Sequence, residues 1–208
     1  GGVKATISKP VFVAGRINRP DVAERILAAG QADMCAMTRG MISDPELANK
    51  AREGRIEDIR TCIGCNQACI GHIQKGVSLS CIQFPESGRE LAYGTLIAAK
   101  RRQRIVVVGG GPAGLKAASI AAARGHDVTL YERETRLGGQ VRLAERLPGR
   151  AEFGGLAENL AHEARRAGVR IHTGIAVSAA LIRDDAPDAV VLATGAKPRA
   201  LDVPAEGA

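Results

Sequence analysis

Cysteines are the residues in this sequence whose type and spacing point most directly to chemistry. Four of the five cysteines form the pattern C-x2-C-x3-C-x11-C: Cys62, Cys65, Cys69 and Cys81. Thiolates at this spacing can reach one metal centre together, and Gly64 lets the backbone fold tightly between the first two. Such a set suits either a 4Fe-4S cluster or a structural zinc ion. One compact triplet followed by a distant cysteine favours the cluster, because zinc sites more often have two C-x2-C pairs.

Other interpretations of the cysteine region lead to separate expectations. Disulfides are disfavoured because the chain does not resemble a small secreted scaffold and no signal peptide opens it, so we expect a cytoplasmic protein with reduced thiols. His72 lies in the same loop, and we expect it to be solvated because four thiolates already complete a ligand set. Cys35 lies among apolar residues and is predicted to belong to the core instead.

A glycine-rich turn is the second feature that predicts a ligand. The apolar run 104–108 leads into G-x-G-x-x-G at Gly109, Gly111 and Gly114, and an alanine-rich helix and a second strand follow. In a βαβ unit of this kind, the glycines allow a tight turn, close approach of a pyrophosphate and packing of helix on strand. Glu132 ends the second strand, where an acidic side chain accepts hydrogen bonds from an adenosine ribose. The segment therefore predicts a site for an adenine dinucleotide.

Further helices and strands are predicted after this unit. The run RLGGQ at 136–140 places two glycines where the backbone can approach a ligand closely. Residues 152–167 carry apolar side chains at helical spacing, which predicts a helix with one buried face. His162 lies next to that face and is expected to be exposed. Two strands are predicted at 169–173 and 189–192.

The first part of the chain alternates strands and helices. A short apolar strand at 10–14 ends at Gly15-Arg16, and a second at 32–37 ends at Thr38-Arg39-Gly40. A helix follows each strand, and the second helix is predicted to start from a capping box at Ser43. Strand-helix units are typical of an α/β fold, and in a (β/α)8 barrel the loops after the last strands form a phosphate site. Arg16 and Arg39 would donate to that phosphate; the alternative is that both only make the surface soluble.

Two strands do not close a barrel. If the repeat belongs to one, about six further strands lie upstream of Gly1, and the chain is a piece of a larger protein. The apolar faces of the two strands, at Val11, Val13, Met34 and Ala36, are then expected to lack the neighbours that would cover them.

Composition argues against several other functions. The chain has 208 residues, 45% of them hydrophobic, and a net charge of +7. Aromatic residues make up only 2%, so stacking platforms for single-stranded nucleic acid are poorly supplied. No apolar run approaches the length of a membrane span, about 18 residues or more. We therefore expect neither a nucleic-acid nor a membrane partner, and we interpret the basic run 100–104 as a solvated segment between domains.

The order of these motifs resembles the iron-sulfur flavoenzymes of the old yellow enzyme class, which include 2,4-dienoyl-CoA reductase, trimethylamine dehydrogenase and N-methyl amine demethylases. The resemblance covers essentially the whole chain, from the barrel end through the cysteines, G-x-G-x-x-G and L-G-G-Q to A-T-G. It implies an α/β architecture: the end of an FMN-binding (β/α)8 barrel, a 4Fe-4S cysteine loop and a partial Rossmann-like domain that binds FAD or NAD(P). The corresponding segments are 1–58, 59–90, a linker at 91–103, and 104–208.

The same resemblance assigns cofactors to residues. It implies that Gly15, Arg16, Thr38 and Arg39 bind the FMN phosphate, and that Cys62, Cys65, Cys69 and Cys81 hold a 4Fe-4S cluster. It implies an FAD or NAD(P) site at Gly109, Gly111, Pro112, Ala113, Gly114, Glu132, Arg133, Gly139, Gln140, Thr194 and Gly195. The acid and base that act on substrate would lie in barrel strands outside this sequence, so no catalytic residue is assigned.

The function implied by the resemblance is an electron relay. Electrons would pass between NAD(P)H or FAD, the cluster and FMN, so that an enoyl- or dienoyl-type substrate is reduced or an N-methyl amine is oxidised. The three-residue gap before Cys69 resembles the dienoyl-CoA reductases, whereas Pro85-Glu86-Ser87-Gly88 resembles the demethylases, so both substrate classes stay open. The implied partners are a small-molecule substrate and an electron-transfer flavoprotein. The competing interpretation is a zinc-knuckle and nucleotide-binding sensor, or an electron-transfer subunit without its own substrate site.

Overall fold

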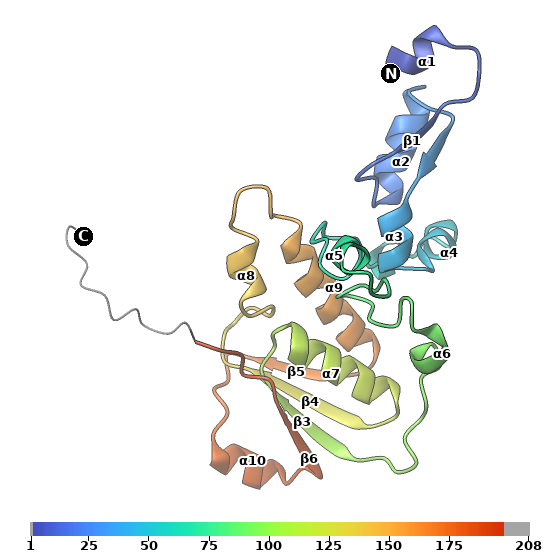
Figure 1. Ribbon diagram of the computed structural model, residues 1–208. Helices are drawn as coiled ribbons and strands as arrows, with labels where there is room; N and C mark the ends of the chain where they lie inside the picture. The colour runs from blue at the N-terminus through green and yellow to red at the C-terminus, as the bar shows by residue number, and fades with distance from the viewer. Residues whose placement is uncertain (1, 198–208) are drawn as a thin grey trace, which may run out of the picture.

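The computed structural model describes residues 2–197, which contain two parallel β-sheets. A two-stranded sheet lies in the N-terminal part and a four-stranded sheet in the C-terminal half, and the cysteine loop connects the two parts (Figure 1). The predicted segments 1–58 and 104–208 extend past the described range, at residue 1 and at residues 198–208. None of the helices within residues 2–197 is long and apolar enough to span a bilayer.

The N-terminal part has the strand-helix alternation predicted from the sequence. In chain order its elements are α1 (Gly2–Thr6), β1 (Phe12–Ala14), α2 (Pro20–Ala28), β2 (Met34–Ala36), α3 (Thr38–Ser43) and α4 (Leu47–Arg52). The two strands pair in parallel, with Val13 opposite Cys35. Pro20 is favourable in the first turn of α2, where its missing N–H donor is not needed.

The start of α4 differs from the prediction. Thr38-Arg39-Gly40, expected to follow the strand as a loop, forms the first turn of α3, and Ser43 ends that helix instead of capping the next. The Ser43 hydroxyl donates to the carbonyl of Arg60 at 2.7 Å. Ser43 and Asp44 are buried, with 1% and 2% exposure. The predicted capping box is therefore wrong, because contacts with the cysteine loop outweigh the local helix signal.

One face of the two-stranded sheet is apolar and exposed. Phe12 is 65% exposed and its strand partner Met34 is 54% exposed, whereas the next residue along each strand, Val13 or Cys35, is half-buried. Side chains alternate between the faces of a strand, so the uncovered face holds Phe12 and Met34 and not Val13. The prediction was right for Met34 and Ala36, which are exposed, and wrong for Val11 and Val13, which are half-buried.

The C-terminal sheet has the order β5-β4-β3-β6, and each neighbouring pair of strands is parallel. Its strands are β3 (Arg104–Val108), β4 (Asp127–Glu132), β5 (Arg170–Thr173) and β6 (Ala189–Leu192). Its helices are α7 (Pro112–Ala123), α8 (Val141–Ala144), α9 (Phe153–Arg166) and α10 (Ala179–Asp185). Helices α7 and α9 lie side by side over the sheet (Figure 1). The sequence predicted every one of these strands but neither α8 nor α10.

The main hydrophobic core lies between this sheet and helices α7 and α9. Leu115 of α7 and Leu130 of β4 are fully buried, and Leu160 of α9 is 4% exposed on the face predicted to be apolar. Ile63, which lies between two of the clustered cysteines, is 3% exposed and belongs to the same core. The cysteine loop is thus packed into the dinucleotide-binding part of the molecule.

The segment that connects the two sheets is short of regular structure. It contains a 3-10 turn, η1 (Ile56–Asp58), and two short helices, α5 (Ile70–Gln74) and α6 (Glu90–Tyr93). Side-chain hydrogen bonds hold it to the N-terminal part: Gln83 Nε2 donates to Ser43 Oγ at 3.4 Å, and Ser87 Oγ donates to the carbonyl of Ile42 at 2.7 Å. The cysteine loop therefore contacts α3, beside the two-stranded sheet, as well as the hydrophobic core of the four-stranded sheet.

Candidate functional site

The four clustered cysteines line a single cavity. Cys62, Cys65, Cys69 and Cys81 are all half-buried free thiols, and the other lining residues include Ile63, which makes the wall partly apolar. Its volume is about 20 Å³. Cys35 is elsewhere, on β2, with its thiol 3.8 Å from the carbonyl of Ala23. The structure thus brings together the four predicted cysteines and leaves the fifth apart.

The turn between the first cysteines has an unusual backbone. Gly64 and Asn66 both have positive φ, 65° and 58°, and this left-handed conformation is favourable for glycine and tolerated by asparagine. The N–H of Gly64 donates to the Cys62 sulfur at 3.5 Å. Arg39 donates to Asn66 Oδ1 at 2.7 Å, which holds the asparagine in place. The turn therefore presents backbone N–H groups to sulfur.

The thiols of Cys62 and Cys65 have pKa values above the ordinary value. Burial is the main cause, neighbouring thiols such as Cys81 add to it, and backbone N–H groups oppose it. Thiols in this environment stay protonated at neutral pH unless a cation lies beside them. A bound metal centre deprotonates its cysteine ligands and would supply that charge.

Two kinds of metal site would use these thiolates differently. A zinc ion needs its sulfurs at about 2.3 Å from one point, whereas the ligands of a 4Fe-4S cluster bind different iron atoms around a larger core. Within residues 2–197, no three Cys, His, Asp or Glu side chains gather closely enough to ligate one metal ion. The four cysteines on the wall of one cavity offer thiolate donors for a metal centre. His72 Nδ1 donates to the Ser78 carbonyl at 2.9 Å and is not among the lining residues.

A second cavity, of about 170 Å³, lies next to the cysteines. The residues predicted to hold a phosphate all line it: Gly15, Arg16, Thr38 and Arg39. Gly15 and Arg16 follow β1 with positive φ, 121° and 49°, and this turn places them at the carboxyl end of the strand. Both Arg39 and Cys62 line the phosphate cavity and the cysteine cavity. The two cavities are therefore immediate neighbours.

Glu152 also lines the phosphate cavity, and it was not predicted from the sequence. It comes from the start of α9, yet its Oε2 accepts from Arg16 Nη2 at 2.7 Å. This contact raises the pKa of Arg16. The two residues are 136 positions apart, so no local pattern could have predicted the pair.

The largest cavity, of about 900 Å³, lies at the carboxyl ends of β3, β4 and β6. This is the edge at which parallel α/β sheets bind ligands. Ten of the residues predicted for a dinucleotide line it: Gly109, Gly111, Pro112, Ala113, Glu132, Arg133, Gly139, Gln140, Thr194 and Gly195. Tyr131, Glu134 and Ile175 also line it and were not predicted, because they belong to no glycine motif.

Gly114 does not line the cavity but shapes it. A Cβ atom at Gly114 would lie 1.9 Å from the carbonyl oxygen of Gly109, and one at Gly109 would lie 2.3 Å from that of Ala193. The second glycine loop packs on the first, since the N–H of Gly138 donates to the Gly110 carbonyl at 2.8 Å. At Gly109 and Gly114 these contacts leave room for the hydrogen atom of glycine but not for a Cβ atom, which explains why both residues are glycine.

Glu132 is buried at the floor of this cavity, with 8% exposure. Its Oε2 accepts from the N–H of Gly110 at 2.6 Å and its Oε1 accepts from the N–H of Glu134 at 2.9 Å. The carboxylate therefore holds the glycine loop in shape. Each carboxylate oxygen has a further lone pair, so the group can still accept from a ribose hydroxyl.

Replacing Glu132 by alanine should weaken FAD binding roughly tenfold to a hundredfold, because one charged hydrogen bond contributes about 1.5–3 kcal/mol. Iron content should not change, since Glu132 is not among the residues that line the cysteine cavity. Asp184→Ala is the matched control, because that side chain on α10 is exposed and does not line the dinucleotide cavity. Calorimetric titration of flavin-free full-length protein with FAD measures the effect. An affinity equal to that of the Asp184 variant would contradict the assignment of Glu132.

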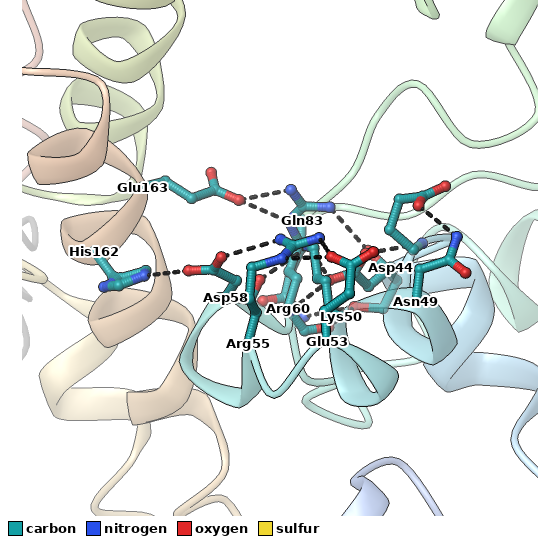
Figure 2. Close-up of polar contacts among 12 residues, drawn as sticks. Asp44, Asn49, Lys50, Glu53, Arg55, Asp58, Arg60, Gln83, His162 and Glu163 are labelled. Carbon is teal, nitrogen blue, oxygen red and sulfur yellow. Dashed lines mark hydrogen bonds and ion pairs between the residues drawn. The ribbon is translucent and has the colours of Figure 1, made fainter.

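Polar contacts join η1 and the start of the cysteine loop to α9 (Figure 2). Asp58 Oδ1 contacts His162 Nε2 at 2.7 Å, and Asp58 also pairs with Arg166 and with Arg55. The hydrogen bond from His162 is the main reason that the pKa of Asp58 falls from 3.8 to about 2. His162 was expected to be exposed, and its side chain is 37% exposed. Its contact with Asp58 on η1 was not predicted from the sequence.

Asp58→Asn should remove part of the acid sensitivity of the protein. The folded-state pKa of Asp58 is below its ordinary 3.8, so its stabilisation is complete above 3.8 and lost as the pH falls towards about 2. The parent should lose on the order of 1 kcal/mol more than the variant over this range, since the exposed partners weaken the interaction. Urea unfolding of both proteins at a series of pH values measures this. Glu57→Gln, in the same turn, is the control, and identical curves for parent and Asp58→Asn would contradict the prediction.

Comparison with known proteins identifies two families that match different parts of the chain. The family described as NADH:flavin oxidoreductase / NADH oxidase matches residues 2–58, and the family described as pyridine nucleotide-disulphide oxidoreductase matches residues 103–208. The chain is 44% identical over 197 residues to an NADH oxidase of Thermoanaerobacter brockii, which covers 94% of this chain and 30% of that protein. It is 40% identical over 209 residues to an N,N-dimethylglycine/sarcosine dehydrogenase of Chromohalobacter salexigens, covering 99% and 30%.

A solved structure has the same arrangement of elements. The structure of 2-naphthoyl-CoA reductase with 2-naphthoyl-CoA superimposes with a TM-score of 0.91 at 36% identity, and the match covers 97% of this chain and 31% of that one. The chain spans about 30% of the length of the curated relatives it matches. The two-stranded sheet thus lies in the part of the chain that matches the NADH:flavin oxidoreductase / NADH oxidase family, and the four-stranded sheet lies in the part that matches the pyridine nucleotide-disulphide oxidoreductase family.

Proposed function

Because this chain belongs to the pyridine nucleotide-disulphide oxidoreductase family and carries the end of an NADH:flavin oxidoreductase domain, we propose that it is the electron-relay part of a longer flavin-dependent oxidoreductase. Family membership supports binding of a flavin and NAD(P)H. The observation that carries the proposal is that the phosphate cavity and the cysteine cavity share the lining residues Arg39 and Cys62. Ile63, next to Cys62, belongs to the hydrophobic core of the four-stranded sheet.

The groups proposed for these cavities supply complementary chemistry: NAD(P)H gives two electrons to FAD as a hydride, a 4Fe-4S cluster carries them singly, and FMN exchanges two electrons and a proton with substrate. Cys62, Cys65, Cys69 and Cys81 would hold the cluster in their cavity. Glu132 and the two glycine loops would bind the adenosine and pyrophosphate of FAD. Gly15, Arg16, Thr38 and Arg39 would bind the FMN phosphate.

This chain would contribute positive charge and backbone N–H groups to the proposed electron relay. Arg16 and Arg39 line the phosphate cavity and suit a phosphate dianion. The N–H of Gly64, directed at the Cys62 sulfur, stabilises negative charge there. Glu152 already neutralises Arg16 at 2.7 Å, so a phosphate would have to share that guanidinium or displace the carboxylate.

We propose two classes of substrate, which differ in their chemistry. One relative with a solved structure is named as a 2-naphthoyl-CoA reductase, and this supports reduction of an enoyl-type substrate. Another is named as an N,N-dimethylglycine/sarcosine dehydrogenase, and this supports oxidation of an N-methyl amine with electrons passed to an electron-transfer flavoprotein. The acid and base that act on substrate would lie in the barrel, outside this chain. Free thiols at the proposed cluster site are typical of a cytoplasmic protein.

Anaerobic purification of the full-length protein tests the relay. We expect iron, acid-labile sulfide, FAD and FMN together, and loss of visible absorbance of both flavin and cluster when NAD(P)H or an N-methyl amine is added. Stoichiometric zinc in place of iron, in a colourless protein, would instead support a zinc and nucleotide sensor. An enoyl-CoA is then tested as the electron acceptor and an N-methyl amine as the electron donor. Turnover of one and not the other identifies the substrate class.

A further inference from the structure

Arg60 is a buried arginine two residues before the first clustered cysteine. It is 8% exposed, and its guanidinium uses all three nitrogens. Nε and Nη2 donate to Glu163 Oε1 at 3.1 and 2.6 Å, and Nη1 donates to the carbonyl of Ser43 at 3.1 Å. The guanidinium carbon lies 4.7 Å from the centre of the Phe84 ring. Figure 2 shows Arg60 and Glu163 reaching towards each other between the cysteine loop and α9.

The partners of Arg60 belong to separate parts of the molecule. Ser43 ends α3 in the barrel end, Glu163 lies on α9, and Phe84 follows the last clustered cysteine by three residues. The backbone of Arg60 is fixed as well, because its N–H donates to Asp44 Oδ2 at 2.8 Å. One side chain therefore contacts the barrel end, the dinucleotide-binding domain and the return of the cysteine loop.

Glu163 extends this contact towards the dinucleotide cavity. Its Oε2 lies 3.4 Å from Lys116 Nζ, and Lys116 is on α7, the helix that starts at the first glycine loop. Burial would raise the pKa of Glu163, but the charges of Arg60 and Lys116 bring it below the ordinary value. Buried charges bound in this way are costly to separate, because removing one partner leaves the other without compensation. The planar guanidinium also fixes orientation, which lysine cannot do.

We propose that Arg60, acting through Glu163, is a positioning residue that sets the distance between the cysteine site and the dinucleotide cavity. This inference rests on the proposed electron relay. The transfer of single electrons between two bound groups becomes steeply slower as their separation grows, so a displacement of the cysteine loop relative to α9 would slow it. A contact that ties the cysteine loop to α9 two residues from Cys62 is placed to prevent such a displacement.

Stopped-flow mixing of the full-length holoenzyme with NAD(P)H under anaerobic conditions tests the proposal. The variants are Arg60→Met, Glu163→Ala and the double variant, with Arg52→Met, an exposed arginine on α4, as control. We expect flavin reduction at the parent rate in all of them, and cluster reduction slowed several-fold in both single variants. The double variant should be no slower than the slower single one, because both changes remove one contact. Glu163→Gln, which keeps an acceptor for Arg60, should recover most of the rate.

Cluster reduction at the parent rate in Glu163→Ala would overturn the proposal, and so would effects that multiply in the double variant. If Arg60→Met loses iron, Glu163→Ala decides alone, since it leaves the bond from Arg60 to Ser43 and the contact with Phe84 in place. Failure of the relay itself looks different: the parent would then show no cluster reduction by NAD(P)H. A relay in the parent that is unchanged in the variants rejects only the role of Arg60.

Discussion

Alanine at any one of Cys62, Cys65, Cys69 or Cys81 is expected to abolish iron binding by the full-length protein. All four side chains line one cavity, and a 4Fe-4S core needs a thiolate on each iron. Burial raises the pKa of the Cys62 and Cys65 thiols, so the remaining three cysteines would not hold an incomplete core tightly. Iron and acid-labile sulfide, measured after anaerobic purification, give the result.

Cys35→Ala is the matched control for these variants. Cys35 is also a half-buried free thiol, but it lies on β2 beside Ala23 and does not line the cavity. Its variant should keep the iron content and visible absorbance of the parent. Iron content unchanged in Cys65→Ala would reject the ligand set, and iron lost from Cys35→Ala would show that the cavity is not the site.

Gly114→Ala should eliminate FAD binding and lower the thermal midpoint of the protein strongly. The added Cβ would lie 1.9 Å from the carbonyl oxygen of Gly109 and 3.1 Å from its carbon, and backbone atoms cannot rotate away as a side chain can. The glycine loop must therefore shift, which moves the N–H groups that would face a pyrophosphate. Flavin content after purification and the thermal midpoint measure the two effects.

Gly155→Ala controls for the change of residue type. Gly155 also lies in a helix, α9, but a Cβ atom there would meet nothing within 4 Å. Alanine is favoured over glycine inside a helix by about 1 kcal/mol, so this variant should bind FAD normally and be no less stable than the parent. A Gly114 variant that binds FAD like the Gly155 variant would show that the loop is more adaptable than its contacts indicate.

Predictions from the sequence were most accurate where a residue type has a single physical reason to occur at its position. β4 and β6 begin and end where predicted, at Asp127–Glu132 and Ala189–Leu192, because each is a run of β-branched and apolar residues bounded by polar ones or glycine. The glycines of the first loop also have the predicted close contacts. Gly114 in particular packs against the turn at Gly109, as expected from a motif that only glycine can satisfy.

Long-range polar contacts were beyond local prediction. The pattern around Ser43 matched a capping box, but Ser43 is buried and donates to Arg60, 17 residues away. His162 looked like a solvated residue on a helix, yet its partner Asp58 is 104 positions distant. Neither spacing nor residue type encodes which distant side chain a polar group will meet. The same holds for Arg60 and Glu163, whose pairing appears only when α9 is packed beside the cysteine loop.

If the cysteine loop binds the proposed iron-sulfur cluster, Ile63 couples that binding to the stability of the neighbouring domain. Its side chain belongs to the same hydrophobic core as Leu115 and Leu137, although it stands between two cysteines. Ordering the loop around an inorganic core would therefore also order this packing, and the free energy of binding that core would add to the stability of the neighbouring domain. Copies made by an iron-starved cell would tolerate less heat in the domain that binds the nucleotide. Proteases would remove such copies first, since they act on the locally opened state.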